Sequence, residues 1–98
     1  MQILIQHRAE ISLRSLPKVK QKQIARALDE LKTADLRLLY SSPKLHRLHA
    51  PLSEKKLYAY RGSLDLRLLL SFEDDTCTVE DVATHERLDR WTGKQRQE

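Results

Sequence analysis

The spacing of apolar residues in the first third of the chain predicts a strand followed by two helices. Ile3-Leu4-Ile5 is apolar and mostly β-branched, which favours a short strand. Between residues 9 and 16 the apolar positions fall at i, i+4 and i+7, which indicates a short helix, and Pro17 suits the first turn of a second one. One face of that second helix is apolar: Ile24, Ala27, Leu28 and Leu31. We expect the two helices to form a hairpin that packs on a sheet.

The remainder of the chain predicts a meander of strands. Ser41-Ser42-Pro43 ends the helical region, and residues 45–48 form a short extended stretch. Three extended segments follow, separated by turns at Gly62-Ser63 and Glu73-Asp74-Asp75: residues 57–60, 66–72 and 77–83. Val79 and Val82 can share a face of the last segment only if that strand contains a bulge.

Together these elements predict a single α+β domain over residues 1–98. An N-terminal strand and a helical hairpin pack on a twisted antiparallel sheet of three to four strands. Leu88 and Trp91 fall in a short C-terminal helix or tail, with Trp91 as an apolar plug on the sheet, and residues 93–98 are expected to fray. A chain of 98 residues supports one modest core and no second domain.

Charge is distributed unevenly along the chain. The formal net charge is +4 and the pI is near 9.4. Residues 1–50 carry ten Lys and Arg against four Asp and Glu, whereas residues 51–98 carry eight against ten. A basic block also runs from Lys44 to Arg67, and such a distribution can orient an anionic partner on one face. For residues 18–32 we favour the simpler interpretation of solvated cations on the back of a helix.

Composition disfavours several classes of protein. The apolar run at residues 3–5 is too short for a signal peptide or a membrane span. Cys77 is the only cysteine, so an internal disulfide and a multi-cysteine metal site are excluded, and we expect it to be buried and inert. Two glycines leave no room for a P-loop or a dinucleotide-binding fingerprint. A cytoplasmic protein without a metal, a small-molecule cofactor or a membrane partner is the expectation.

Two arginines are the first candidates for chemistry. Arg61 and Arg67 bracket a turn, and Arg67 lies within a strongly apolar run, so it must point to the wet face of the sheet or pair in a cleft. A guanidinium group suits phosphate because its planar fork makes two charge-assisted hydrogen bonds. The simpler interpretation is a surface arginine that pairs across the strand with Asp65, Glu80 or Asp81.

Histidines and tyrosines offer weaker candidates. His46 and His49 lack other ligands at a metal-binding spacing, so zinc is not expected. His85 directly follows a strand, where loop residues often carry chemistry, although a lone histidine is more often structural. Tyr58 and Tyr60 share one face of a strand, and aromatic faces beside cations can stack nucleobases.

The second half of the chain resembles the RelE/ParE toxin superfamily. The resemblance rests on residues 57–70, on the acidic turn and strand that follow, and on His85-Glu86-Arg87-Leu88-Asp89-Arg90-Trp91. The helix after Leu16-Pro17 and the block at residues 44–48 are also similar, so nearly the whole chain is covered. The resemblance implies a helical hairpin on a twisted antiparallel sheet and a toxin of a toxin–antitoxin pair.

The resemblance also implies an activity and its residues. RelE-like members cleave mRNA in the ribosomal A site without a metal: the 2′-hydroxyl attacks the adjacent phosphate, and basic side chains stabilise the developing charge. By position, Arg61 and Arg67 would grip the scissile phosphate, and His85 and Arg87 would lie beside the leaving group. Contacts to RNA would come from Lys44, Arg47, Lys55, Lys56 and Tyr60. The implied partners are a cognate antitoxin, mRNA and the ribosome.

One departure from the superfamily pattern leaves alternatives open. A tyrosine that follows the histidine in one branch falls on Asp89 here, and an aspartate can neither stack on a base nor attract phosphate. Either His85 or Tyr60 supplies the proton, or the nuclease activity is lost. The alternatives are a ParE-like inhibitor of DNA gyrase and a degenerate binding protein. For the nuclease, Arg67→Ala is expected to abolish cleavage with little loss of stability.

Overall fold

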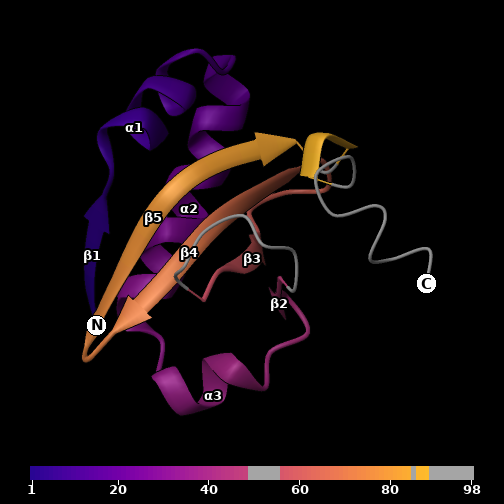
Figure 1. The fold of residues 1–98 in the computed structure, drawn as a ribbon. Coiled ribbons are helices and arrows are strands. Elements are labelled where there is room, and N and C mark those ends of the chain that lie inside the picture. The colour runs from indigo at the N-terminus through magenta and orange to yellow at the C-terminus, as the bar shows by residue number, and fades with distance from the viewer. Residues whose placement is uncertain (49–55, 85, 89–98) are drawn as a thin grey trace.

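The fold is a five-stranded mixed sheet with helices packed against one face (Figure 1). The computed structural model describes residues 1–48, 56–84 and 86–88. Along the chain its helices and strands are β1 (Gln2–Ile5), α1 (His7–Arg14), α2 (Lys18–Thr33), α3 (Leu36–Tyr40), β2 (Leu45–Arg47), β3 (Tyr58–Arg61), β4 (Leu66–Glu73) and β5 (Thr76–Thr84).

The strands are ordered β1-β5-β4-β3-β2 across the sheet. Strands β2 to β5 form the antiparallel meander that the sequence predicts. Strand β1 adds to β5 as a parallel edge strand, with Gln2 opposite Thr76 and Ile5 opposite Val79. The α+β class is confirmed. The sheet differs from the expectation in one respect: it has five strands rather than three to four and is mixed, because β1 joins the antiparallel meander as a parallel edge strand.

Alternation along β4 separates the two faces of the sheet. Leu66, Leu68 and Leu70 point to one face and are buried against α2, where Ile24 and Leu31 are also almost fully buried. In Figure 1, α2 accordingly lies behind β4 and β5. This helix-covered face holds the main core of the protein.

The other face, which we name the open face, carries a much smaller apolar cluster. Its buried members are Ala59, Leu69 and Leu88. Leu88 lies in a helical turn at residues 86–88, so the chain after β5 returns over this face. Trp91 and residues 93–98, for which a plug and fraying were predicted, lie outside the described residues.

Strand β5 contains the bulge that its two valines predict. The register shifts between Leu69 and Leu70, which pair with Asp81 and Val79 respectively. Glu80 is therefore the extra residue of the bulge. Because of this insertion both valines of β5 are buried in the main core.

The helical region has a break that the apolar pattern did not reveal. α2 begins directly after Pro17, as predicted, and ends where Ala34 adopts an extended conformation. Asp35 then caps α3, its carboxylate accepting a hydrogen bond from the backbone nitrogen of Arg37 at 2.9 Å. Leucines continue through both helices, which masks the interruption. Among the helices that the structure describes, none is long and apolar enough to cross a membrane.

Candidate functional site

The β3–β4 turn, residues 62–65, brings the two candidate arginines together. Arg61 ends β3, Arg67 is the second residue of β4, and the ladder pairs them directly. Residues that lie directly opposite one another point to the same side of a sheet. Both arginines alternate in phase with Ala59 and Leu69, so both belong to the open face.

The guanidinium group of Arg67 is largely buried within this turn. The residue is 9% exposed. Its Nη1 donates to the carbonyl oxygens of Ser63 at 2.9 Å, Leu66 at 3.0 Å and Leu64 at 3.4 Å. Charge-assisted bonds of this kind fix the guanidinium plane and hold the turn in one shape. Arg67 is therefore a buried residue that organises the turn.

Arg61 is the exposed member of the pair. Within residues 1–48, 56–84 and 86–88, no carboxylate forms an ion pair with it. Asp65, close by in the turn, instead pairs with Lys20 of α2 at 2.7 Å. The hydrogen bond from Lys20 holds the pKa of Asp65 below its usual range. The positive charge of Arg61 thus faces solvent without compensation from this acid.

Arg87 approaches the same end of the sheet. Thr84 ends β5 and pairs with Leu66, the first residue of β4, which directly precedes Arg67. Its Oγ1 accepts a hydrogen bond from the backbone nitrogen of Arg87 at 3.0 Å, and the Arg87 side chain is exposed. His85, predicted to act with Arg87, lies outside the described residues, as does Asp89.

Tyr60 lies on the helix-covered face, away from Arg61. It is 4% exposed, and its hydroxyl donates to Glu30 Oε1 at 3.2 Å. Burial, together with the charge and hydrogen bond of Glu30, raises the pKa of Tyr60 to about 12. Its ring has no accessible face for a nucleobase, and its hydroxyl keeps its proton at neutral pH. Glu30 also accepts from Lys44 Nζ at 3.4 Å, and the Lys44 carbonyl accepts from the Arg61 backbone nitrogen at 2.9 Å.

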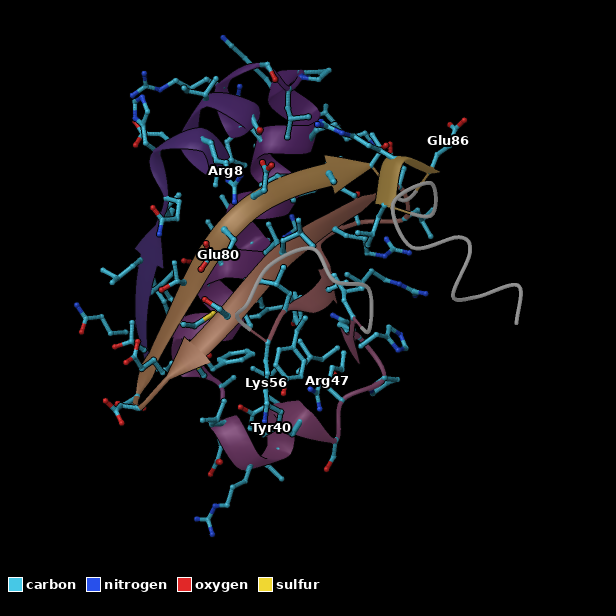
Figure 2. All side chains as sticks on the ribbon, in the orientation of Figure 1. Arg8, Tyr40, Arg47, Lys56, Glu80 and Glu86 are labelled. Atoms are coloured by element: carbon cyan, nitrogen blue, oxygen red, sulfur yellow. The ribbon has the colours of Figure 1, made fainter. Side chains whose placement is uncertain are left out.

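Two further candidates for RNA contact lie toward α3. Arg47 pairs with Tyr58, whose ring centroid is 5.6 Å from that of Tyr40 in α3. Lys56 precedes β3, and Figure 2 shows Arg47 and Lys56 projecting near α3. Both side chains are exposed. Lys55 lies outside the described residues. The predicted cations therefore form two groups, one around the β3–β4 turn and one near α3.

A polar centre at the β5 bulge fastens α1 to the sheet (Figure 2). Glu80 is 7% exposed, and its carboxylate accepts a hydrogen bond from Ser71 Oγ at 2.6 Å. From α1, Arg8 Nε donates to the Glu80 carbonyl at 3.2 Å, and Ser12 Oγ donates to Asp81 Oδ1 at 2.9 Å. Sequence reasoning missed this buried carboxylate, although the predicted bulge marked its position.

The structure offers no cluster of metal ligands in the ranges that it describes. Cys77 is fully buried, as predicted. Burial raises the pKa of its thiol to about 12, so it stays protonated at neutral pH and lacks the thiolate that reactive cysteines need.

Comparison with known proteins identifies the architecture. No family model and no curated protein match the sequence. A chain of the archaeal RelE–RelB complex from Pyrococcus horikoshii OT3 is similar, with a TM-score of 0.66, 19% identity, and coverage of 88% of this chain and 96% of the other. YafQ from E. coli strain BL21(DE3) gives a TM-score of 0.67, 16% identity and coverage of 89% and 96%. The chain has the RelE-like toxin fold.

A third RelE-like structure agrees with the first two. The YoeB–YefM complex from Staphylococcus aureus contains a chain with a TM-score of 0.62 and 18% identity, which covers 87% of this chain and 97% of that one. At these identities the likeness establishes the path of the backbone. The likeness alone assigns no activity to the side chains of this protein.

Sequence reasoning found the arginines but not the framework that holds them. Gly62 sits so close to α2 that an added Cβ would meet Ile24 Cδ1 at 2.6 Å. Lys20 anchors the turn to α2 through Asp65. Neither contact joins residues near in sequence, so no local pattern could reveal it. Leu64, an apolar residue at the predicted turn, was visible in the sequence and was overlooked.

Proposed function

We propose that this protein is the toxin of a toxin–antitoxin pair and acts as a metal-independent endoribonuclease that cleaves mRNA on the ribosome. One observation carries the proposal: Arg61 and Arg67 face each other at the end of the RelE-like sheet that Arg87 also approaches. The exposed guanidinium group of Arg61, with the buried charge of Arg67 across the ladder and Arg87 near the same end of the sheet, favours a bound phosphate.

The proposed reaction is an internal transfer at phosphorus. The 2′-oxygen of the RNA attacks the adjacent phosphorus, the bond to the 5′-oxygen breaks, and a 2′,3′-cyclic phosphate remains. Negative charge that develops on the non-bridging oxygens is stabilised by preorganised cations. Arg61, exposed and without an acidic partner among the described residues, would bind these oxygens. Arg67 would hold the turn that positions Arg61 and add positive charge beside the phosphate.

Two protons must also move, one from the 2′-hydroxyl and one to the 5′-oxygen. The resemblance places His85 and Arg87 beside the leaving group, and we propose that these residues act there. Tyr60 is not proposed for it, because its hydroxyl is buried on the helix-covered face and donates to Glu30.

The proposed partners are a cognate antitoxin, mRNA and the ribosome. Two similar structures are complexes, RelE with RelB and YoeB with YefM, which supports a protein partner. The remaining cations of the prediction would contact the RNA backbone or ribosomal RNA: Lys44, Arg47, Lys55 and Lys56. Asp89 in place of the superfamily tyrosine favours a second candidate, a protein that retains the fold and partner but has lost cleavage.

The decisive experiment expresses the chain without any partner and maps mRNA 5′ ends while growth is followed. The proposal predicts arrest with cleavage at ribosome-occupied codons. Arg61→Ala should abolish both effects, whereas Arg37→Ala, which removes an exposed arginine of α3, should preserve them.

Other outcomes separate the alternatives. Arrest with intact mRNA and DNA-damage signalling would favour a ParE-like gyrase inhibitor. Normal growth with abundant folded protein would favour the degenerate binding protein. Cleavage that persists in Arg61→Ala would refute the role given to the arginine pair.

A further inference from the structure

Leu64 stands in the β3–β4 turn and is 87% exposed, more than any other large hydrophobic residue in the part of the chain that the structure describes. Isolated exposed leucines are common on protein surfaces. Leu38 of α3, at 73% exposure, is an example in this protein. What distinguishes Leu64 is the rigidity and the charge of the segment that carries it.

The backbone of the turn is closed around one carbonyl. The backbone nitrogens of Gly62 and Ser63 donate to the Leu66 oxygen at 3.0 and 3.3 Å. Arg67 Nη1 reaches the same oxygen at 3.0 Å and the Ser63 oxygen at 2.9 Å. Burying a guanidinium group is costly, so its use here marks a turn that is held in one conformation.

The turn is also fastened to α2. Asp65 Oδ1 accepts from Ser63 Oγ at 3.0 Å and from Lys20 Nζ at 2.7 Å. Gly62 lies against Ile24, where a Cβ would approach Cδ1 to 2.6 Å. An apolar side chain on such a support loses little conformational entropy when it contacts a ligand.

The charge around Leu64 favours a polyanion over an apolar protein pocket. Arg61 is exposed beside the turn and Arg67 lies inside it, while Asp65, the acid of the turn itself, pairs with Lys20 of α2. Nucleic acid combines phosphates for such cations with apolar base faces. Leucine is among the side chains that proteins insert between stacked bases to unstack them.

We propose that Leu64 is an apolar wedge that packs against the base next to the phosphate bound at Arg61 and separates it from its neighbour. This inference rests on the proposed function and names how that site handles its RNA. In a stacked strand the 2′-oxygen, the phosphorus and the 5′-oxygen are not collinear. Separating adjacent bases lets the ribose turn and brings the 2′-oxygen into line for attack.

The test uses paused ribosomes whose A-site codon carries 2-aminopurine at one of its three positions in turn. A 2′-O-methyl group on the attacking nucleotide blocks cleavage, so the fluorescence reports unstacking alone. Leu64→Ser is compared with Leu38→Ser, a matched loss of an exposed leucine, and with Leu64→Met, which keeps an apolar side chain. Unmodified mRNA gives the cleavage rate in parallel.

We expect the wild-type protein, Leu38→Ser and Leu64→Met to raise the fluorescence at one codon position. Leu64→Ser should leave the fluorescence low and cleave about tenfold more slowly, the effect of losing one buried leucine contact. All variants should show the same urea midpoint, because both leucines are exposed.

The wedge is overturned, with the nuclease intact, if Leu64→Ser matches Leu38→Ser in fluorescence and cleavage. It is also overturned if Leu64→Ser impairs only antitoxin binding, which would assign the residue to a protein contact. A wild-type protein that neither cleaves mRNA nor changes the fluorescence would refute the proposed function and the wedge together.

Discussion

Replacing Arg67 with methionine should lower the free energy of unfolding by about 2 kcal/mol. The variant removes two well-formed charge-assisted hydrogen bonds, to Ser63 at 2.9 Å and Leu66 at 3.0 Å, each worth roughly 1.5–3 kcal/mol. The hydrogen bond to the Leu64 carbonyl, at 3.4 Å, is too long to contribute much to the free energy of unfolding. Part of the loss is recovered, because no charge remains buried and two backbone nitrogens still donate to the Leu66 carbonyl.

Urea denaturation followed by circular dichroism measures this loss. At a slope of about 1 kcal/mol per molar urea, which suits a domain of this size, the midpoint should fall by about 2 M. Arg61→Met is the matched control, because it changes the residue directly across the ladder but at an exposed position. The control should lie within about 0.5 kcal/mol of the wild type.

The same pair of variants separates structure from catalysis. The sequence-based expectation that an Arg67 variant would be nearly as stable as the wild type conflicts with the burial of this side chain. Both substitutions should reduce cleavage, Arg61→Met in a fully folded protein and Arg67→Met in a weakened one. Equal urea midpoints for the two variants would show that the carbonyl contacts of Arg67 do not stabilise the turn.

Three further predictions follow from buried contacts. The pKa of Tyr60 is raised to about 12 in the folded protein, against a pKa of 10.0 for a free tyrosine, so the free energy of unfolding should fall as the pH rises between these values. In Tyr60→Phe, the fall in this free energy between pH 9 and pH 11, measured by urea titrations, should be smaller by about 1.4 kcal/mol. An unchanged fall would contradict the raised pKa. Gly62→Ala should lower the free energy of unfolding by about 1–3 kcal/mol, because its Cβ clashes with Ile24 Cδ1. Combining it with Ile24→Val, which removes that atom, should restore most of the stability in thermal melts. If the double variant stays as unstable as Gly62→Ala, the clash is not the cause. Ser71→Ala should lower the free energy of unfolding by about 1–3 kcal/mol, because it removes a hydrogen-bond donor from the buried Glu80 carboxylate. An unchanged melting temperature would show that this hydrogen bond does not stabilise the protein.

The elements of the meander follow from local rules and could be predicted. Alternation marks β3, a strongly apolar run marks β4, acidic residues mark the hairpin turn before β5, and Val79 and Val82 require the bulge that the structure contains. The partner of β1 could not be predicted, because Ile3-Leu4-Ile5 is equally suited to either edge of a sheet. Its parallel pairing depends on how the intervening helices α1, α2 and α3 pack against the sheet, which no short window of sequence records.

The site shows the same division between local and long-range information. The register that places Arg61 opposite Arg67 follows from a turn that is visible in the sequence. Burial cannot be read from the sequence: Tyr60 is an aromatic residue that could stack on a base, but its side chain points into the core toward Glu30. Arg67 is likewise a residue type typical of the surface, but its guanidinium group is buried in the turn, where it donates to the Ser63 carbonyl.

The pairing of Gln2 with Thr76 has a consequence for synthesis. Strand β1 is made well before β5, the strand with which it pairs. Contacts between segments so distant in sequence form late and slow the folding reaction. A nascent chain therefore cannot close its sheet until β5 has left the exit tunnel. Until then the turn that holds Arg61 and Arg67 lacks the completed sheet that supports it.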